Sequence, residues 1–471
     1  MNPVTRSTRK YYFRKLDLLN LRKLGLLVTN HEKFNKCHEY LLNILKTNVE
    51  EGLLNTLVQF YDPAYHCFTF LDYQLVPTLE EYFYLIGLPL SDKEPFNDSE
   101  PTPKTSTIAT ALSLEPSDMV HPHYTTKGGF QGLTANFLHQ KAISFAQNKK
   151  TVAFHSLLAL LIYGLVLFPD VDGFVNINAI KIFLTKNPVP TLLADTYHSI
   201  HDRTDKGQGT IRCYAQLLYK WFLLHLPNHF RTNPDNVRWS QKIMSLTPAD
   251  IVWYNAAYDT GTIIDSCGEF PNVPLIGIRE RINYNPALAM RQFRYPMERP
   301  RYISLDGIFY LNQQDSSGMR GKFERAWRTI HKKGKGQLGR RSSMVSKSYT
   351  QWVIDRAAKY GMPYPLQRVP SSTSSSTPSP IPLETREDFQ EQLTEAKLER
   401  DTWQRRAREA ELKNETLSGE IERLKHQLLD QNRRLIEKDD LLRRKDALLG
   451  QDVSRKRKFM ELFDGPHPDF E

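Results

Sequence analysis

The densest group of potential metal ligands in the sequence is YHSIHDRTD, residues 197–205. His198 and His201 are three residues apart, and Asp202 and Asp205 each follow one of them by four residues. On a helix, this spacing can bring imidazole and carboxylate groups to one face, where they could hold zinc. A polar helix end has the same pattern, and it is the interpretation that we favour. We therefore expect no bound metal.

Groups for covalent or phosphate chemistry are present but form no local signature. Cys37-His38 and His66-Cys67 are neighbours in sequence, an arrangement in which two side chains rarely face each other. The glycine turns at 127–130 and 205–209 lack the spacing of a P-loop. The four cysteines form no CxxC pair, which favours a reducing compartment over a disulfide scaffold or a zinc module; they are Cys37, Cys67, Cys213 and Cys267. We therefore expect no enzyme activity and no cofactor.

Positive charge is concentrated in one part of the chain. The net charge is +10, and residues 301–368 hold 14 Lys and Arg against four Asp and Glu. Such a concentration favours a polyanionic partner. Residues 321–335 predict an amphipathic helix with Phe323 and Trp327 on its inner face, and an ordinary solvated outer face is the alternative to a binding site. The candidate anion-binding residues are Lys322, Arg325, Arg328, Lys332, Lys333, Lys335, Arg340 and Arg341.

These groups must be positioned by a core, and residues 152–168, VAFHSLLALLIYGLVLF, are its most apolar stretch. The stretch carries no formal charge and would span roughly 25 Å as a helix, slightly less than the apolar thickness of a bilayer. A membrane span and a buried central helix are therefore the two interpretations. His155, Ser156 and Gly164 favour the buried helix, as does the polar remainder of the chain (mean hydropathy −0.51).

Shorter patterns around this stretch predict further helices and a few strands. Helical spacing is present at 32–45, 132–149 and 211–226, whereas residues 66–75 alternate as in a hairpin. Two T-x-x-E sequences predict capping boxes, Thr47 with Glu50 and Thr78 with Glu81, and the helix after the second ends at Gly87. Frequent Gly and Pro at 259–300 predict irregular structure with short strands. We expect a mainly α fold (α+β with a few short strands).

Residues 49–90, VEEGLLNTLVQFYDPAYHCFTFLDYQLVPTLEEYFYLIGLPL, resemble the core of the plant mobile domain family. With later segments, the resemblance covers roughly residues 30–365 and is to an uncharacterised, legume-rich branch labelled "aminotransferase-like plant mobile domain". It implies a plant protein of transposon ancestry, and the label implies no demonstrated activity. Glu81 stands where the family has Asp, and Phe60-Tyr61 replaces a tryptophan-containing segment. The matching positions are Leu53, Leu54, Leu57, Phe68, Thr78, Leu79, Leu85, Gly87, Leu88 and Pro89.

The last hundred residues have a different composition. Residues 369–383 are rich in Ser and Pro and predict a disordered linker. From 384 to 451, mostly apolar residues recur in steps of four and three, which predicts a parallel coiled coil and a homodimer. Its seam residues include Leu417, Ile421, Leu424, Leu428, Leu435, Leu442 and Leu449. The tail at 452–471 contains a candidate nuclear import signal, Arg455, Lys456, Arg457 and Lys458.

The sequence thus predicts five regions: a basic arm at 1–29, a globular domain at 30–368, the linker, the coiled coil and the tail. We expect a non-enzymatic, transposon-derived nuclear protein that self-associates and contacts nucleic acid weakly. A protein-interaction scaffold that meets an acidic partner is one alternative, and a degenerate or unrecognised transposon-related enzyme is another. If the tail does not direct nuclear import, we expect a cytoplasmic protein, with no membrane partner in either case.

Overall fold

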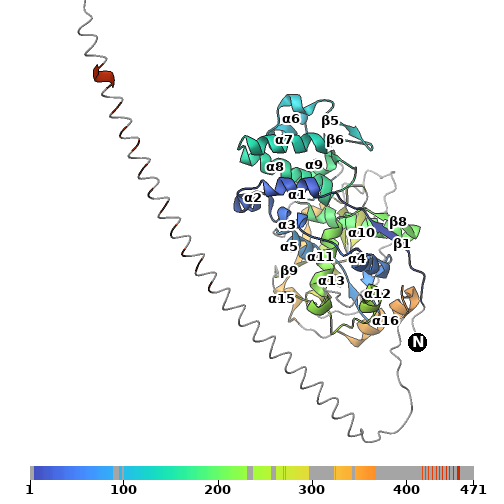
Figure 1. The fold of residues 1–471 in the computed structure, drawn as a ribbon. Helices are drawn as coiled ribbons and strands as arrows, with labels where there is room; N and C mark the ends of the chain where they lie inside the picture. Colours follow the sequence, from blue (N-terminus) through green and yellow to red (C-terminus); the bar gives the residue numbers. More distant parts are fainter. Residues whose placement is uncertain are drawn as a thin grey trace, which may run out of the picture. The chain divides into compact units, whose positions relative to one another are not determined.

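The computed structural model divides the chain into two compact units, Met1–Val369 and Pro370–Glu471. The first unit is mainly α-helical with short strands, as the sequence predicts (Figure 1). The residues that the structure describes are 5–88, 95–97, 100–230, 237–255, 261–268, 270, 272–279, 281–295, 323, 325–341, 345–365, 416, 420, 423, 427, 431, 434, 438, 442, 445, 449 and 453–456.

Helices are the main regular elements of the first unit. The earlier ones are α1 (Leu19–Leu26), α2 (His31–His38), α3 (Leu41–Leu45), α4 (Glu51–Leu57), α5 (Leu79–Ile86), α6 (Thr105–Leu112), α7 (Ala135–Gln147) and α8 (Thr151–Ile162). The later ones are α9 (Ile177–Thr185), α10 (Val189–Lys206), α11 (Ala215–His225), α12 (Trp239–Met244), α13 (Ala287–Gln292), α15 (Lys335–Leu338) and α16 (Lys347–Tyr360). Short helical turns are η1 (Val58–Phe60), η2 (Pro116–Met119), the π-helical η3 (Tyr163–Leu167) and η4 (Asn228–Phe230).

The strands are short and form several small sheets. They are β1 (Lys10–Phe13), β2 (Tyr61–Asp62), β3 (Cys67–Thr69), β4 (Gln74–Leu75), β5 (Tyr124–Lys127), β6 (Phe130–Thr134), β7 (Phe174–Asn176), β8 (Gln208–Ile211), β9 (Thr262–Cys267), β10 (Val273–Ile276), β11 (Arg281–Tyr284) and β12 (Ile330–Gly334). Antiparallel pairing joins β2–β3–β4, β5–β6–β7, β10–β11 and β12–β9, whereas β1 pairs with β8 in parallel.

The N-terminal residues belong to the first unit. β1 lies beside β8, with Lys10 opposite Gln208, and α1 buries Leu21 and Leu24 in the core. The Arg14 guanidinium donates hydrogen bonds to backbone carbonyls after η3. The sequence predicts a separate basic arm at residues 1–29. In the structure, the described part of this segment instead packs on the rest of the first unit through β1, Leu21, Leu24 and Arg14.

The segment before the hairpin differs from the prediction in two places. One helix is predicted at 32–45, but Glu39 (φ 53°) interrupts it between α2 and α3. The Thr47–Glu50 capping box is also wrong, because α4 begins at Glu51 with no side-chain cap. The Thr47 hydroxyl instead donates to the Asn43 carbonyl, at 3.5 Å.

The hairpin and the helix after it are confirmed. β3 and β4 pair as a hairpin, and α5 starts with the predicted capping box. The Thr78 hydroxyl accepts a hydrogen bond from the Glu81 N–H at 3.1 Å, while the Glu81 carboxylate accepts one from the Thr78 N–H at 3.2 Å. Gly87 ends the helix in the left-handed region (φ 81°). Here start, period and end are all local signals, so the sequence alone specifies the element.

The apolar stretch at 152–168 is a buried helix, as predicted. It forms α8 and η3, and nearly all of its side chains are buried. A helix that is apolar on every side must be covered on every side, and α1, α2, α6, α7 and α9 all contact α8. Across the part of the chain that the structure describes, no helix is both long enough and apolar enough to cross a membrane.

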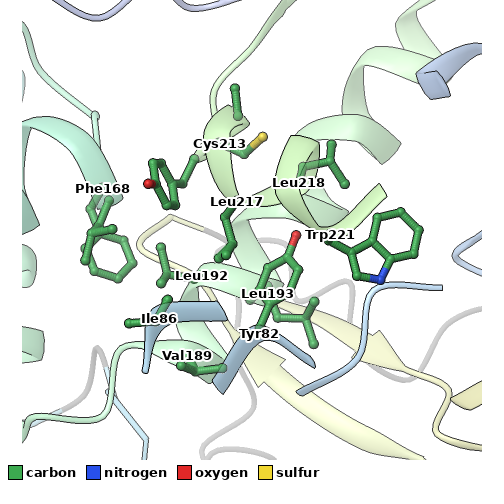
Figure 2. Packing of buried hydrophobic residues seen from close by; sticks show 14 of the residues in the cluster. Tyr82, Ile86, Phe168, Val189, Leu192, Leu193, Cys213, Leu217, Leu218 and Trp221 are labelled. Carbon is green, nitrogen blue, oxygen red and sulfur yellow. The ribbon is translucent and has the colours of Figure 1, made fainter. Parts of the chain in front are cut away.

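Another part of the core lies where α5 meets α10 and α11. Figure 2 shows Tyr82 and Ile86 of α5 facing side chains from both of the other helices. The hairpin adds Phe68, whose ring stacks on Trp221 of α11 at 5.6 Å. The labelled α10 and α11 contacts, with Cys213 just before α11, are Val189, Leu192, Leu193, Cys213, Leu217, Leu218 and Trp221.

Within the second unit, every described position from 416 to 456 is helical. Two of the seam residues are among these positions. Leu442 and Leu449 are exposed in the single chain, by 58% and 62%. They are seven residues apart and therefore share one helix face. The other seam residues, Leu417, Ile421, Leu424, Leu428 and Leu435, lie outside the described residues.

Candidate anion-binding surface

The basic segment is built differently from the single helix that the sequence predicts. Residues 325–328 are helical, but the chain then becomes β12, which pairs antiparallel with β9. The prediction of a helix over 321–335 is therefore wrong from Ile330 onward. It failed because β9 lies more than 60 residues earlier, and no local pattern shows such a partner.

The inner face of this segment is confirmed. Phe323, Ala326 and Trp327 are buried, and the Trp327 indole N–H donates to the Pro274 carbonyl at 2.8 Å. This contact fixes the helical turn against β10. The basic side chains on the same turn consequently point outward, which leaves Arg325 and Arg328 exposed.

The two lysines of β12 have acidic neighbours. The Lys333 ammonium lies 2.9 Å from Asp265 on β9, and His331 binds the same carboxylate. The charge of half-buried Lys332 acts on Glu80 in α5, where it favours the ionised carboxylate. Both lysines therefore serve internal electrostatics, and we remove them from the anion-binding set.

The remaining candidates form the exposed part of the segment. Arg325, Arg328 and Arg340 are exposed, and Arg341 lies over the Tyr254 ring at 4.4 Å while donating to its hydroxyl at 2.7 Å. A guanidinium that packs over an aromatic ring still presents nitrogen donors at its edge. Lys322 and the side chain of Lys335 lie outside the described residues.

The metal candidates on α10 are divided between two rows of the helix. His201 lies 3.1 Å from Asp205, and its ring meets His66 edge-on at 5.1 Å. His198 and Asp202 instead line a cavity on another side of α10. Burial lowers the pKa of His198 to about 4, so this imidazole is neutral at physiological pH. Among the described residues, no three His, Cys, Asp or Glu side chains come together as metal ligands.

The structure contains a buried polar centre at Glu81 that the sequence did not predict. The Glu81 carboxylate accepts hydrogen bonds from the Trp221 indole at 2.8 Å, the Gln292 amide at 3.1 Å and the Thr78 hydroxyl at 2.9 Å. His225 Nε2 lies 3.1 Å from the same carboxylate. The capping box was the only sequence signal of this centre, because its partners come from residues up to 211 positions away. The centre is closed to solvent, so it ties helices together rather than binding a ligand.

Three of the cysteines are also closed to solvent. Cys67, Cys213 and Cys267 are buried, whereas Cys37 is exposed. Burial raises the pKa of all three buried thiols, that of Cys267 to about 12. A thiol in its protonated form is a poor nucleophile, so these residues are suited to packing.

The nuclear import candidate is described only in part. Arg455 and Lys456 are helical and exposed. Arg457 and Lys458 lie outside the described residues.

The sequence profile of one protein family matches most of the chain. The family is described as a domain of unknown function (DUF7745), and the match covers residues 21–358. It ends before the linker and the predicted coiled coil. No curated protein and no solved structure matches the chain.

Proposed function

The chain belongs to the DUF7745 family, and on that premise we propose that it is a non-enzymatic protein that contacts nucleic acid through exposed arginines and self-associates through residues 384–451. The proposal includes transposon ancestry in plants, supported by the resemblance of residues 49–90 to the plant mobile domain. It also includes a nuclear location, supported by the basic cluster that starts at Arg455.

The observation that carries the proposal is the charge imbalance of the exposed segment. Between residues 325 and 359 the chain has ten Lys and Arg and a single acidic residue, Asp355. After the internal contacts of Lys332 and Lys333 are set aside, Arg325, Arg328 and Arg340 remain on the surface. Phosphate neutralisation by such cations drives sequence-nonspecific binding to nucleic acid.

Charge reversal tests the proposal. The variant carries Arg325→Glu, Arg328→Glu and Arg340→Glu, and its binding to a fluorescent DNA duplex is followed by anisotropy at low salt. We expect at least about a tenfold loss of affinity, because three phosphate contacts become repulsive. A matched control reverses three exposed lysines elsewhere, Lys23, Lys46 and Lys149, and should bind almost as the unmodified protein does.

The same variant also distinguishes between the two candidate partners, nucleic acid and an acidic protein. If the triple reversal leaves DNA binding intact, the nucleic-acid proposal is wrong. A pull-down with and without nuclease treatment then tests the scaffold alternative, which predicts a nuclease-resistant partner that the triple variant loses.

A further inference from the structure

A polar cavity of about 340 Å³ lies along one side of α10. α10 contributes residues in steps of three and four, so they share one helix face. The rest of the wall comes from the turn after η3, from β8 and from the residues that follow β10. The side chains that matter below are Asp195, His198, Arg203, Lys206, Arg212 and Arg279.

Three of the four cations already hold carboxylates within this cavity. Arg203 and Lys206 lie 3.0 Å and 2.6 Å from Asp202. Arg279 donates through its Nε to Asp170 at 2.5 Å. Asp170 and Asp202 also line the cavity, so each of these pairs holds its cationic group at the cavity wall. An anionic ligand could therefore meet them without large rearrangement, which is the main cost of assembling a binding site.

Arg212 is the exception. Its backbone N–H donates to the Ser199 hydroxyl at 2.6 Å, which fixes the residue against α10. Its guanidinium forms no ion pair with any residue in the described part of the chain, and it acts on exposed Asp172 only through space. A planar fork of donors that lines a cavity without a carboxylate suits a phosphate group.

The two titratable groups on α10 add neutral hydrogen-bonding capacity. Asp195 accepts a hydrogen bond from the Ile278 N–H at 2.9 Å, and burial raises the pKa of its carboxyl to about 7, with the charge of Asp170 adding to the rise. The carboxyl is thus partly protonated near neutral pH and can donate. His198 is neutral, as its lowered pKa requires.

We propose that this cavity binds a small molecule that carries a phosphate group, with Arg212, Arg203 and Arg279 around the phosphate and Asp195 and His198 bonded to its other polar groups. The cavity volume is near the lower end of the range for small-molecule sites, about 300–1,000 Å³. A compact phosphorylated metabolite fits this size, whereas an extended polymer does not. The inference is independent of the proposed nucleic-acid surface, since the two share no residue.

The test uses the full-length protein and isothermal titration calorimetry with three probes: inorganic phosphate, adenosine monophosphate and adenosine. We expect saturable one-to-one binding of the two phosphate-bearing probes and none of adenosine. Arg212→Ala should weaken binding about tenfold, as expected for one lost charge-assisted hydrogen bond. The affinity of Arg212→Lys should lie between those of the unmodified protein and Arg212→Ala. The matched control is Arg238→Ala, which changes an exposed arginine just before α12 and should leave binding unchanged.

Several outcomes would overturn the proposal. Equal binding of adenosine and its monophosphate would show that phosphate is not recognised, and unchanged affinity in Arg212→Ala would place the site elsewhere. If neither phosphate-bearing probe shows saturable binding, the proposal is wrong. The charge-reversed variant of Arg325, Arg328 and Arg340 should still bind adenosine monophosphate. If this variant loses that binding, the phosphate site is the basic segment and not the cavity.

Discussion

Glu80 and Glu81 are neighbours at the start of α5, yet their carboxyl groups have different surroundings. Glu81 has hydrogen bonds from three side chains. Glu80 accepts no side-chain hydrogen bond within the described structure: one of its oxygens accepts from the Ile264 N–H at 2.9 Å, and the other has no hydrogen-bond partner there. Burial raises the pKa of Glu80 to about 7, although the charge of Lys332 opposes the rise.

This raised pKa makes a prediction about stability. Between the ordinary value of 4.5 and about 7, the folded state binds the Glu80 proton more firmly than the unfolded state. The contribution of Glu80 to stability therefore falls as pH rises through this window, by about 3 kcal/mol in total. Glu80→Gln removes this dependence. Urea unfolding should show the variant gaining about 3 kcal/mol relative to the unmodified protein between pH 4.5 and about pH 8.

The control for that experiment is Glu32→Gln, an exposed position on α2. Its stability difference from the unmodified protein should be nearly constant with pH. A constant difference for Glu80→Gln as well would mean that the Glu80 carboxyl is not held in its protonated form by burial.

At the scale of elements, the sequence predicted an element correctly where nearby residues determine both its start and its end. α5 is the best case, because its cap residues and its terminal glycine lie within ten positions of each other. β12 is the opposite case: residues 330–334 carry helical spacing, but pairing with β9 decides their conformation. Glu39 likewise divides a predicted helix, because its φ is positive (53°), a conformation that a glutamate in the sequence does not predict.

The end of α5 supplies a prediction. Gly87 has φ 81°, and an added Cβ would lie 1.9 Å from the Tyr40 ring. Gly87→Ala combines backbone strain with this clash, so we expect a loss of at least about 2 kcal/mol in urea unfolding.

A second glycine separates the two effects. Gly129 has φ 85° with no atom near its would-be Cβ, so Gly129→Ala should cost only the backbone part, about 1 kcal/mol. Equal losses for the two variants would show that Tyr40 moves aside freely and that the close approach is not a constraint.

At the scale of the whole molecule, composition and period predicted the mainly α fold and the buried central helix at 152–168. They did not predict which polar groups meet inside. The cavity beside α10 is an example: the sequence shows His198 and Asp202 on a helix, but Arg212 and Arg279 arrive from other elements. The same limit applies to the four metal candidates on α10, which the structure divides between two rows of side chains.

Self-association is predicted at this scale. Leu442 and Leu449 are exposed on one helix face in the single chain, and each would contribute about 2 kcal/mol when buried in a dimer. Leu442→Lys with Leu449→Lys should raise the dimer dissociation constant at least about a hundredfold in analytical ultracentrifugation. Thr416→Lys with Gln427→Lys, at helical positions outside the seam, should leave the dimer intact. A monomeric unmodified protein would refute the coiled-coil dimer.

The central claim is that exposed arginines of the basic segment contact phosphates. The most direct measurement is the affinity of the full-length protein for a DNA duplex over a series of salt concentrations. The logarithm of the binding constant should fall linearly with the logarithm of the salt concentration, with a slope of about −3 if Arg325, Arg328 and Arg340 each neutralise one phosphate. The charge-reversed variant should show a much smaller slope, because Arg341 is the only one of the four exposed arginine candidates that it keeps. No binding at low salt, or a slope that the variant shares, would contradict the account.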